Sequence, residues 1–174
     1  MAADIVTYIR DLCNQAKNGD VISLGFTRDE MRNKILEIQS TLKKAQDSGE
    51  AEKCELDVVF PLKHYFAPKV YAREMTLPAG HWIIGKIHRH SHLNFVTKGR
   101  VAVITEDGVS PIAAPYTFVS SIGTKRLVLV LEETLWTTVH VTDKTDLLQI
   151  ENEVIAPSYE DLPAVEKSEI RGIV

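Results

Sequence analysis

The chain has 174 residues, of which 44% are hydrophobic and 25% charged, and its formal net charge is −4. This length fits one ordinary domain with additional material at the ends, and the composition is that of a soluble globular protein rather than of a disordered or fibrous one. The mild acidity and the lack of a basic stretch argue against general binding of nucleic acid.

The cysteines and the first residues indicate where the protein resides. Two cysteines, Cys13 and Cys54, are too few for a secreted disulfide scaffold, so we expect free thiols in a reducing compartment. The segment 1–5 lacks the basic and apolar regions of a signal peptide, and no segment is apolar over the ~20 residues that span a membrane. The sequence therefore predicts a cytoplasmic protein without a membrane partner.

Residues 1–50 are predicted to form a helical extension. A first helix is indicated by apolar residues at helical spacing, before Gly19. A second helix starts at Thr27, which forms the pattern of a capping box with Glu30, and it is expected to run to about Lys44. Its apolar stripe indicates packing either on the same domain or on another subunit. The stripe consists of Met31, Ile35, Ile38 and Leu42. A polar linker follows at 48–52.

From residue 57 the pattern changes to short strands between turn signals, and the predicted fold class is mainly β. Strands without an intervening helix indicate an antiparallel sandwich or barrel, which we place at 57–155. The remainder, 156–174, is predicted to be a surface tail. The expected strands cover 58–60, 70–77, 81–88, 93–98, 100–106, 117–121, 126–132 and 134–141.

A histidine-rich run, 88–92, is the strongest candidate for chemistry. In an extended strand residues two apart share a face, so His88, His90 and His92 are expected to project together. His140 shares a predicted strand face with Trp136 and can point toward them. Converging imidazoles are good ligands for a first-row transition metal.

The spacing around this run resembles the first motif of the cupin superfamily, whose members have an RmlC-like jelly-roll barrel. The motif is Gly, five residues, His-X-His, three residues, Glu, six residues, Gly, and here it is matched at Gly80, Lys86, His88, His92 and Gly99. Lys86 replaces the first histidine and His92 replaces the glutamate. The resemblance therefore implies a cupin-type antiparallel β-barrel with an altered ligand set.

The second cupin motif is matched more loosely. It aligns at Pro115, Gly123, Arg126 and Val130, with Arg126 at the position of the third histidine ligand. The fifteen residues between Gly99 and Pro115 equal the short gap of the family. The runs 85–88, 92–94, 105–108 and 136–140 also resemble small cupin-like hypothetical proteins of tailed bacteriophages. Such an origin would place the protein in the cytoplasm of the bacterial host.

Three functions stay open from these residues. In the first, His88, His92 and His140, with His90 as a further candidate, bind a divalent transition metal, whether Zn, Fe, Mn or Ni. In the second, a metal-free pocket binds a small anion such as a nucleotide or sugar phosphate. The ligand-binding candidates, of which Glu106 also fits a hairpin turn, are Lys86, Arg126, Arg73, Tyr71 and Glu106.

In the third, the protein is a non-catalytic structural or interaction module of a phage. The resemblance to cupins implies a homo-oligomer, a dimer or higher, formed through sheet contacts, to which the N-terminal helices can add surface. The sequence does not establish an enzyme activity.

Overall fold

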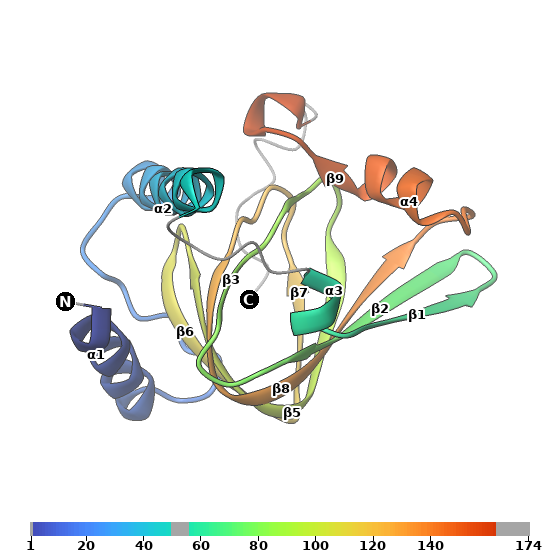
Figure 1. Cartoon of the computed structure of the whole chain (residues 1–174). Coiled ribbons are helices and arrows are strands. Elements are labelled where there is room, and N and C mark those ends of the chain that lie inside the picture. Colours follow the sequence, from blue (N-terminus) through green and yellow to red (C-terminus); the bar gives the residue numbers. More distant parts are fainter. Residues whose placement is uncertain (1, 50–55, 163–174) are drawn as a thin grey trace.

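The computed structural model describes residues 2–49 and 56–162 (Figure 1). The helices are α1 (Ala2–Gln15), α2 (Arg28–Ser48), α3 (Leu56–Val59), α4 (Leu147–Val154) and the short 3-10 helix η1 (Tyr159–Asp161). The strands are β1 (Leu62–Ala67), β2 (Val70–Leu77), β3 (Trp82–Ile84), β4 (Ile87–His88), β5 (His92–Thr105), β6 (Gly108–Ala113), β7 (Tyr116–Ser120), β8 (Leu127–Val141) and β9 (Ile155–Ala156).

The predicted fold class is confirmed, because the chain is mainly β and antiparallel, of the jelly-roll type, with an N-terminal helical extension. The main sheet has the order β1-β2-β8-β5-β6, with β3 also paired to β8 and β7 also paired to β5. Strands β4 and β9 form a separate pair. Among the described residues these pairings do not close into a complete ring, so the sheet is a strongly curved open one.

The two long central strands bend in the middle and divide the main sheet into two halves. The pairing of β5 with β8 shifts register between Val96 and Val101. Gly99 lies at this bend with φ +83°, and a Cβ there would lie 2.1 Å from the Glu133 carbonyl oxygen. The site half contains β1, β2, β7 and the adjoining ends of β5 and β8, and the helix half contains β3, β6 and the other ends.

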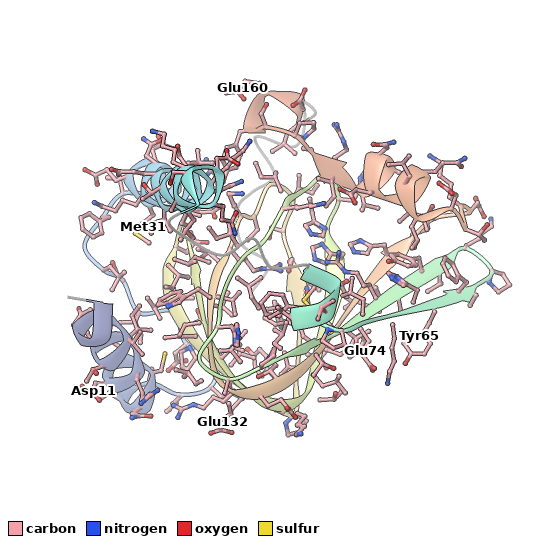
Figure 2. All side chains as sticks on the ribbon, viewed as in Figure 1. Asp11, Met31, Tyr65, Glu74, Glu132 and Glu160 are labelled. Atoms are coloured by element: carbon pink, nitrogen blue, oxygen red, sulfur yellow. The ribbon has the colours of Figure 1, made fainter. Side chains whose placement is uncertain are left out.

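Helices α1 and α2 cover the helix half from outside (Figure 1). Cys13, Met31 and Ile35 are buried there against β5, β6 and β8, and Figure 2 labels Met31 beside α2. The stripe on α2 thus packs on its own domain, as one of the two interpretations predicted. Its last members, Ile38 and Leu42, are 40% and 45% exposed, so only the first half of the stripe is packed on the sheet.

The expected start of α2 is confirmed in detail. The Thr27 backbone N–H donates to the Glu30 carboxylate at 2.8 Å, and the Glu30 N–H donates to the Thr27 hydroxyl at 3.3 Å. This reciprocal pair satisfies two free donors of the first turn. Of the helices that the structure describes, none is long and apolar enough to cross a membrane.

Several expected elements differ in the structure. Residues 58–60 were expected to be a strand, but helix α3 includes two of them, and Phe60 instead anchors this segment in the core. Strand β6 was missed because it contains Pro111, which β6 tolerates as the last strand in the sheet order. Two pairs of predicted strands are each one bent strand in the structure. Strand β5 replaces the pair 93–98 and 100–106, and strand β8 replaces the pair 126–132 and 134–141. Helix α2 continues to Ser48.

The C-terminal segment is more closely attached than a surface tail. Strand β9 pairs with β4, and Leu162 is buried beside Ile87 and Ala156. Arg89 fastens the segment by donating to the carbonyls of Ile155 and Asp161 at 2.9 and 2.7 Å. The rest of the predicted tail, Cys54 and most of the predicted linker lie outside the described residues.

Candidate metal and ligand site

Strand register aligns the candidate side chains on the inner face of the site half. Tyr71 pairs with His140 across β2 and β8, and His92 pairs with Ser120 across β5 and β7. Leu93 pairs with Val139, so the neighbouring His92 lies beside His140. Since directly opposed residues share a face, these side chains form one row across the sheet.

Three histidines converge at this row. His88 comes from β4, His92 from the start of β5 and His140 from the end of β8, and each is at most 7% exposed. One ring nitrogen of each lies within 4.8 Å of the others. The ring centroids are 4.1 Å apart for His88 and His92, 5.2 Å for His88 and His140, and 4.8 Å for His92 and His140.

The environment holds all three imidazoles in the neutral form. Burial is the main cause and lowers the pKa of His88 to about 2, of His92 to about 3 and of His140 to about 4. Repulsion from Arg126 and Arg73 lowers these pKa values further. Neutral imidazole is the form that binds a metal ion.

Two nitrogens of this cluster have no hydrogen-bond partner among the described residues. They are Nδ1 of His88 and Nε2 of His92, and both are buried. His92 donates from Nδ1 to the His90 carbonyl at 3.3 Å, which leaves Nε2 as the unprotonated nitrogen. An unpartnered buried polar group costs about 1–3 kcal/mol, and a bound cation would relieve that cost.

The donor set fits a transition metal. Two nitrogens at about 2.1 Å from a common zinc ion are at most about 4.2 Å apart. The present limit of 4.8 Å slightly exceeds this span, so small side-chain rotations would complete the coordination. Three protein ligands leave at least one coordination position for water or a ligand.

His90 does not join the cluster. The residues between β4 and β5 form a bend, and the His90 side chain is exposed. The alternation of inward and outward side chains holds only within a strand, so the prediction that included His90 among the metal ligands is wrong.

A cavity of about 380 Å³ lies next to the histidines and shares His88 with a second cavity of about 190 Å³. His140 lines the second cavity. Most of the residues that line the larger cavity are apolar. The full lining consists of Phe60, Leu62, Arg73, Met75, Leu77, Trp82, Ile83, Ile84, Gly85, Lys86, His88, Arg126, Val128, Trp136, Thr138, Glu151 and Ile155.

The predicted cationic residues do line these cavities. Arg126 borders the larger one, while Arg73 and Lys86 border both. Lys86 forms an ion pair with Glu151 of α4, and both side chains are more than half exposed. Burial lowers the pKa of Arg126 to about 10, so its guanidinium is still charged at neutral pH.

Tyr71 supports the site from the smaller cavity. Its hydroxyl shares a 2.8 Å hydrogen bond with Nδ1 of His64, and its ring stacks on His140 with centroids 6.3 Å apart. Burial raises the pKa of Tyr71, so the phenol is protonated at neutral pH. Tyr71 thus positions His140 and also lines the smaller cavity.

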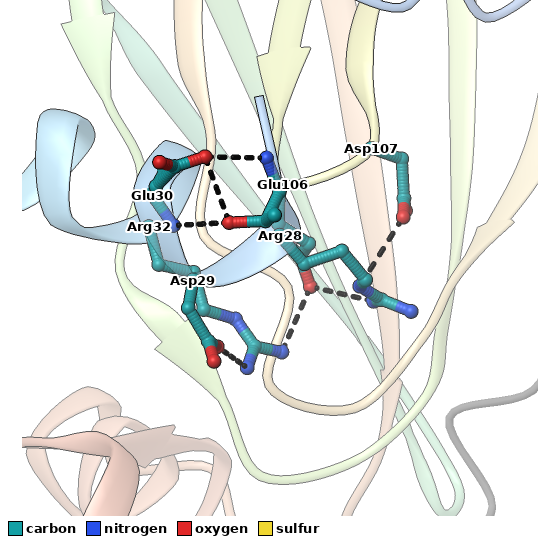
Figure 3. A network of polar contacts seen from close by, with 7 residues as sticks. Arg28, Asp29, Glu30, Arg32, Glu106 and Asp107 are labelled. Carbon is teal, nitrogen blue, oxygen red and sulfur yellow. Dashed lines mark hydrogen bonds and ion pairs between the residues drawn. The ribbon is translucent and has the colours of Figure 1, made fainter. Parts of the chain in front are cut away.

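Glu106 lies elsewhere. It is in the turn between β5 and β6, and its buried carboxylate accepts from Arg28 at 3.1 Å and from Arg32 at 3.2 Å (Figure 3). Asp107 adds a contact to Arg28 at 3.3 Å. Glu106 lines neither cavity, so its assignment to the ligand pocket is corrected: it fastens α2 to the hairpin.

The sequence analysis missed a polar network behind the histidines. Asn94 is fully buried, accepts from the Trp136 indole at 3.0 Å and donates to the Ser120 hydroxyl at 2.7 Å. Arg126 donates to the same hydroxyl. Asn94 lies two residues from His92 on the same strand face, which was the available signal, whereas nothing in the sequence indicated Ser120.

No family model and no curated protein matches the chain. Among solved structures, KdgF from Halomonas sp. aligns with 57% of this chain and 93% of its own, at 17% identity and a TM-score of 0.46. A cupin 2 domain-containing protein from Halorhodospira halophila aligns with 63% of this chain and 78% of its own, at 18% identity and a TM-score of 0.44.

An RmlC-like cupin from Shewanella frigidimarina aligns with 48% of this chain and 76% of its own, at 14% identity and a TM-score of 0.42. At such low identities and scores these similarities assign no function, and the fold class rests on the strand pairing. The resemblance to phage proteins stays a prediction.

Proposed function

We propose that this protein is a cupin that binds one divalent transition metal through His88, His92 and His140 and presents it to a small ligand in the adjacent cavity. The observation that carries the proposal is the convergence of three buried imidazoles, two of which have unpartnered nitrogens. Four motif spacings and the antiparallel jelly-roll topology support the assignment to the superfamily.

The departures from the cupin ligand set are compatible with this proposal. Lys86 occupies the position of the first histidine, but its side chain pairs with Glu151 at the rim. His140 supplies the third nitrogen from the far end of β8. The set is therefore three histidines, a donor set that suits Zn, Fe, Mn or Ni.

The chemistry of the centre follows from its surroundings. When bound, such a metal acts as a Lewis acid toward a ligand oxygen or nitrogen. His88 faces both cavities, so a ligand in the larger cavity reaches the centre from that side. The largely apolar wall of this cavity lowers the local polarity and so strengthens electrostatic interactions there.

Metal analysis of protein purified without a histidine tag tests the proposal. We expect close to one equivalent of a transition metal per chain, or one equivalent of zinc taken up after treatment with a chelator. Free zinc at 100 times its Kd should raise the free energy of unfolding by about 2.7 kcal/mol. A metal-free sample that takes up no Zn, Fe, Mn or Ni would overturn the proposal.

A further inference from the structure

We propose that the larger cavity binds a small organic acid, with its carboxylate on the Arg126 guanidinium and an aromatic or branched apolar body against the inner wall. The inference rests on the proposed metal centre, because the same cavity is lined by His88. It names the class of ligand that the metal would meet there.

Arg126 is held as an anion receptor. One of its amino groups donates to the Ser120 hydroxyl, and its guanidinium carbon lies 5.8 Å from the Phe118 ring centre and 5.7 Å from that of Trp136. These contacts fix the guanidinium plane without using most of its five N–H donors. Arg126 lines the larger cavity, so its guanidinium borders the space in which a ligand would lie.

Among the described residues, Lys86 on the cavity wall is paired with Glu151, whereas Arg126 and Arg73 have no such carboxylate partner. In the part of the chain that the structure describes, no carboxylate lies within ion-pair distance of Arg126 or Arg73. Glu106 acts on Arg126 only at longer range, and its carboxylate is engaged by Arg28 and Arg32. Two cations beside a divalent metal, in surroundings of low polarity, favour an anionic ligand.

The wall selects among anions. Besides Arg126, the polar lining side chains are Arg73, Lys86, His88, Thr138 and Glu151, of which Lys86 and Glu151 pair with each other and His88 is a proposed metal ligand. A sugar or nucleotide with several hydroxyl groups would leave some of them without partners, at about 1–3 kcal/mol each. The volume of about 380 Å³ is near the lower end of the usual range for ligand pockets. A planar guanidinium matches a carboxylate with two parallel hydrogen bonds. A compact monocarboxylate satisfies the charge, the size and the apolar wall together.

Calorimetric titration of the zinc-loaded protein tests this inference with phenylacetate and isovalerate as probes. We expect one site per chain for at least one of these acids, and affinity for the neutral amide of that acid at least about tenfold lower. Glucose 6-phosphate should bind more weakly than the acid. No binding of either acid at 10 mM, equal binding of acid and amide, or tighter binding of glucose 6-phosphate would overturn the inference. The concentration of 10 mM is about the weakest Kd that is of interest here.

Variants locate the site. Arg126→Gln should lower the affinity for the acid at least about tenfold, and Arg126→Lys, which keeps the charge but loses the fork, should lower it by a smaller factor. Lys98→Gln removes a cation from an exposed ion pair outside the cavity and should change nothing. Unchanged binding in folded Arg126→Gln and Arg126→Lys would contradict the assignment of Arg126.

Zinc content is measured on every sample, which separates the two proposals. Binding of the acid that depends on Arg126 in a protein unable to hold zinc would overturn the metal centre and support the role of Arg126. Zinc bound at one equivalent without any acid binding would support the metal centre and overturn the ligand class.

Discussion

At the scale of single residues, burial decides the chemistry of the site. His88, His92 and His140 are deprived of water, and Arg73 and Arg126 add repulsion, so protonation is disfavoured at all three. The folded protein therefore offers three neutral imidazoles. A metal ion can bind them at neutral pH without first displacing a proton. The same depression of the pKa values makes the folded state sensitive to acid.

Protein stripped of metal should lose stability as the pH falls from 6.5 to 5. The unfolded chain protonates these histidines near pH 6.5, while their folded pKa values of about 2, 3 and 4 keep them neutral, so the unfolded state binds more protons. Each buried histidine contributes at most about 1.4 kcal/mol per pH unit. Urea unfolding at several pH values measures the slope.

The control for this slope is a histidine at the surface. His140→Gln should reduce the pH dependence, whereas His81→Gln, which removes an exposed imidazole in a turn, should leave it as in the natural protein. An equal slope in all three proteins would show that the buried cluster does not govern the acid sensitivity.

Neighbouring histidines of the same run should behave differently toward metal. His92→Gln removes a ligand and should weaken zinc binding more than about 100-fold, a larger loss than substitutions outside the ligand set cause. His90→Gln should leave the affinity unchanged because His90 is exposed and outside the cluster. Competition with a chromogenic chelator measures both affinities, and equal losses would contradict the assignment.

At the scale of elements, the bend of β5 and β8 positions the site. The inner face of the site half, which bears His92 and His140, lies beside His88 of β4. Gly99 makes the bend possible for two reasons. Its φ of +83° is a left-handed conformation that favours glycine, and the nearby Glu133 carbonyl leaves no room for a Cβ. The conformation and the contact both depend on this residue.

Gly99→Ala should therefore destabilise the fold by about 2 kcal/mol or more, the sum of a left-handed conformation and a backbone clash. Gly25→Ala is the matched control, because Gly25 has φ +77° but nothing lies within 4 Å of its added Cβ. The control should lose only about 1 kcal/mol. Thermal and urea unfolding compare the two variants, and equal losses would show that the contact with Glu133 is unimportant.

The link between α2 and the β5–β6 turn should be structural only. Glu106→Ala leaves Arg28 and Arg32 without their shared carboxylate and should cost about 1–3 kcal/mol, less than a fully buried pair because both arginines are partly exposed. Glu132→Ala, at an exposed position labelled in Figure 2, is the control. Zinc affinity should be unchanged in both variants. A loss of zinc affinity in Glu106→Ala alone would show that Glu106 contributes to the metal site.

At the scale of the whole molecule, sequence patterns predicted the fold better than the site. Alternation and turn signals yielded the mainly β architecture, and the capping box at Thr27 located α2. The patterns did not reveal β6, because Pro111 masks an edge strand, or the bent continuity of the two central strands. Such features depend on pairing partners that are distant in the sequence.

The site required knowledge of register. His88 and His92 were predicted from the motif spacing and His140 from its strand face, but His90 was wrongly included because the strand ends at His88. Ser120 entered only through its pairing with His92. Oligomer formation was also predicted from the resemblance and stays a prediction.

The central claim is that His88, His92 and His140 bind one metal ion. A crystal structure of the protein grown with zinc, with anomalous data at the zinc absorption edge, tests it most directly. The account predicts one strong peak per chain at about 2.0–2.1 Å from a nitrogen of each of these histidines. A peak only at other residues, or none between these three side chains at saturating zinc, would contradict the account.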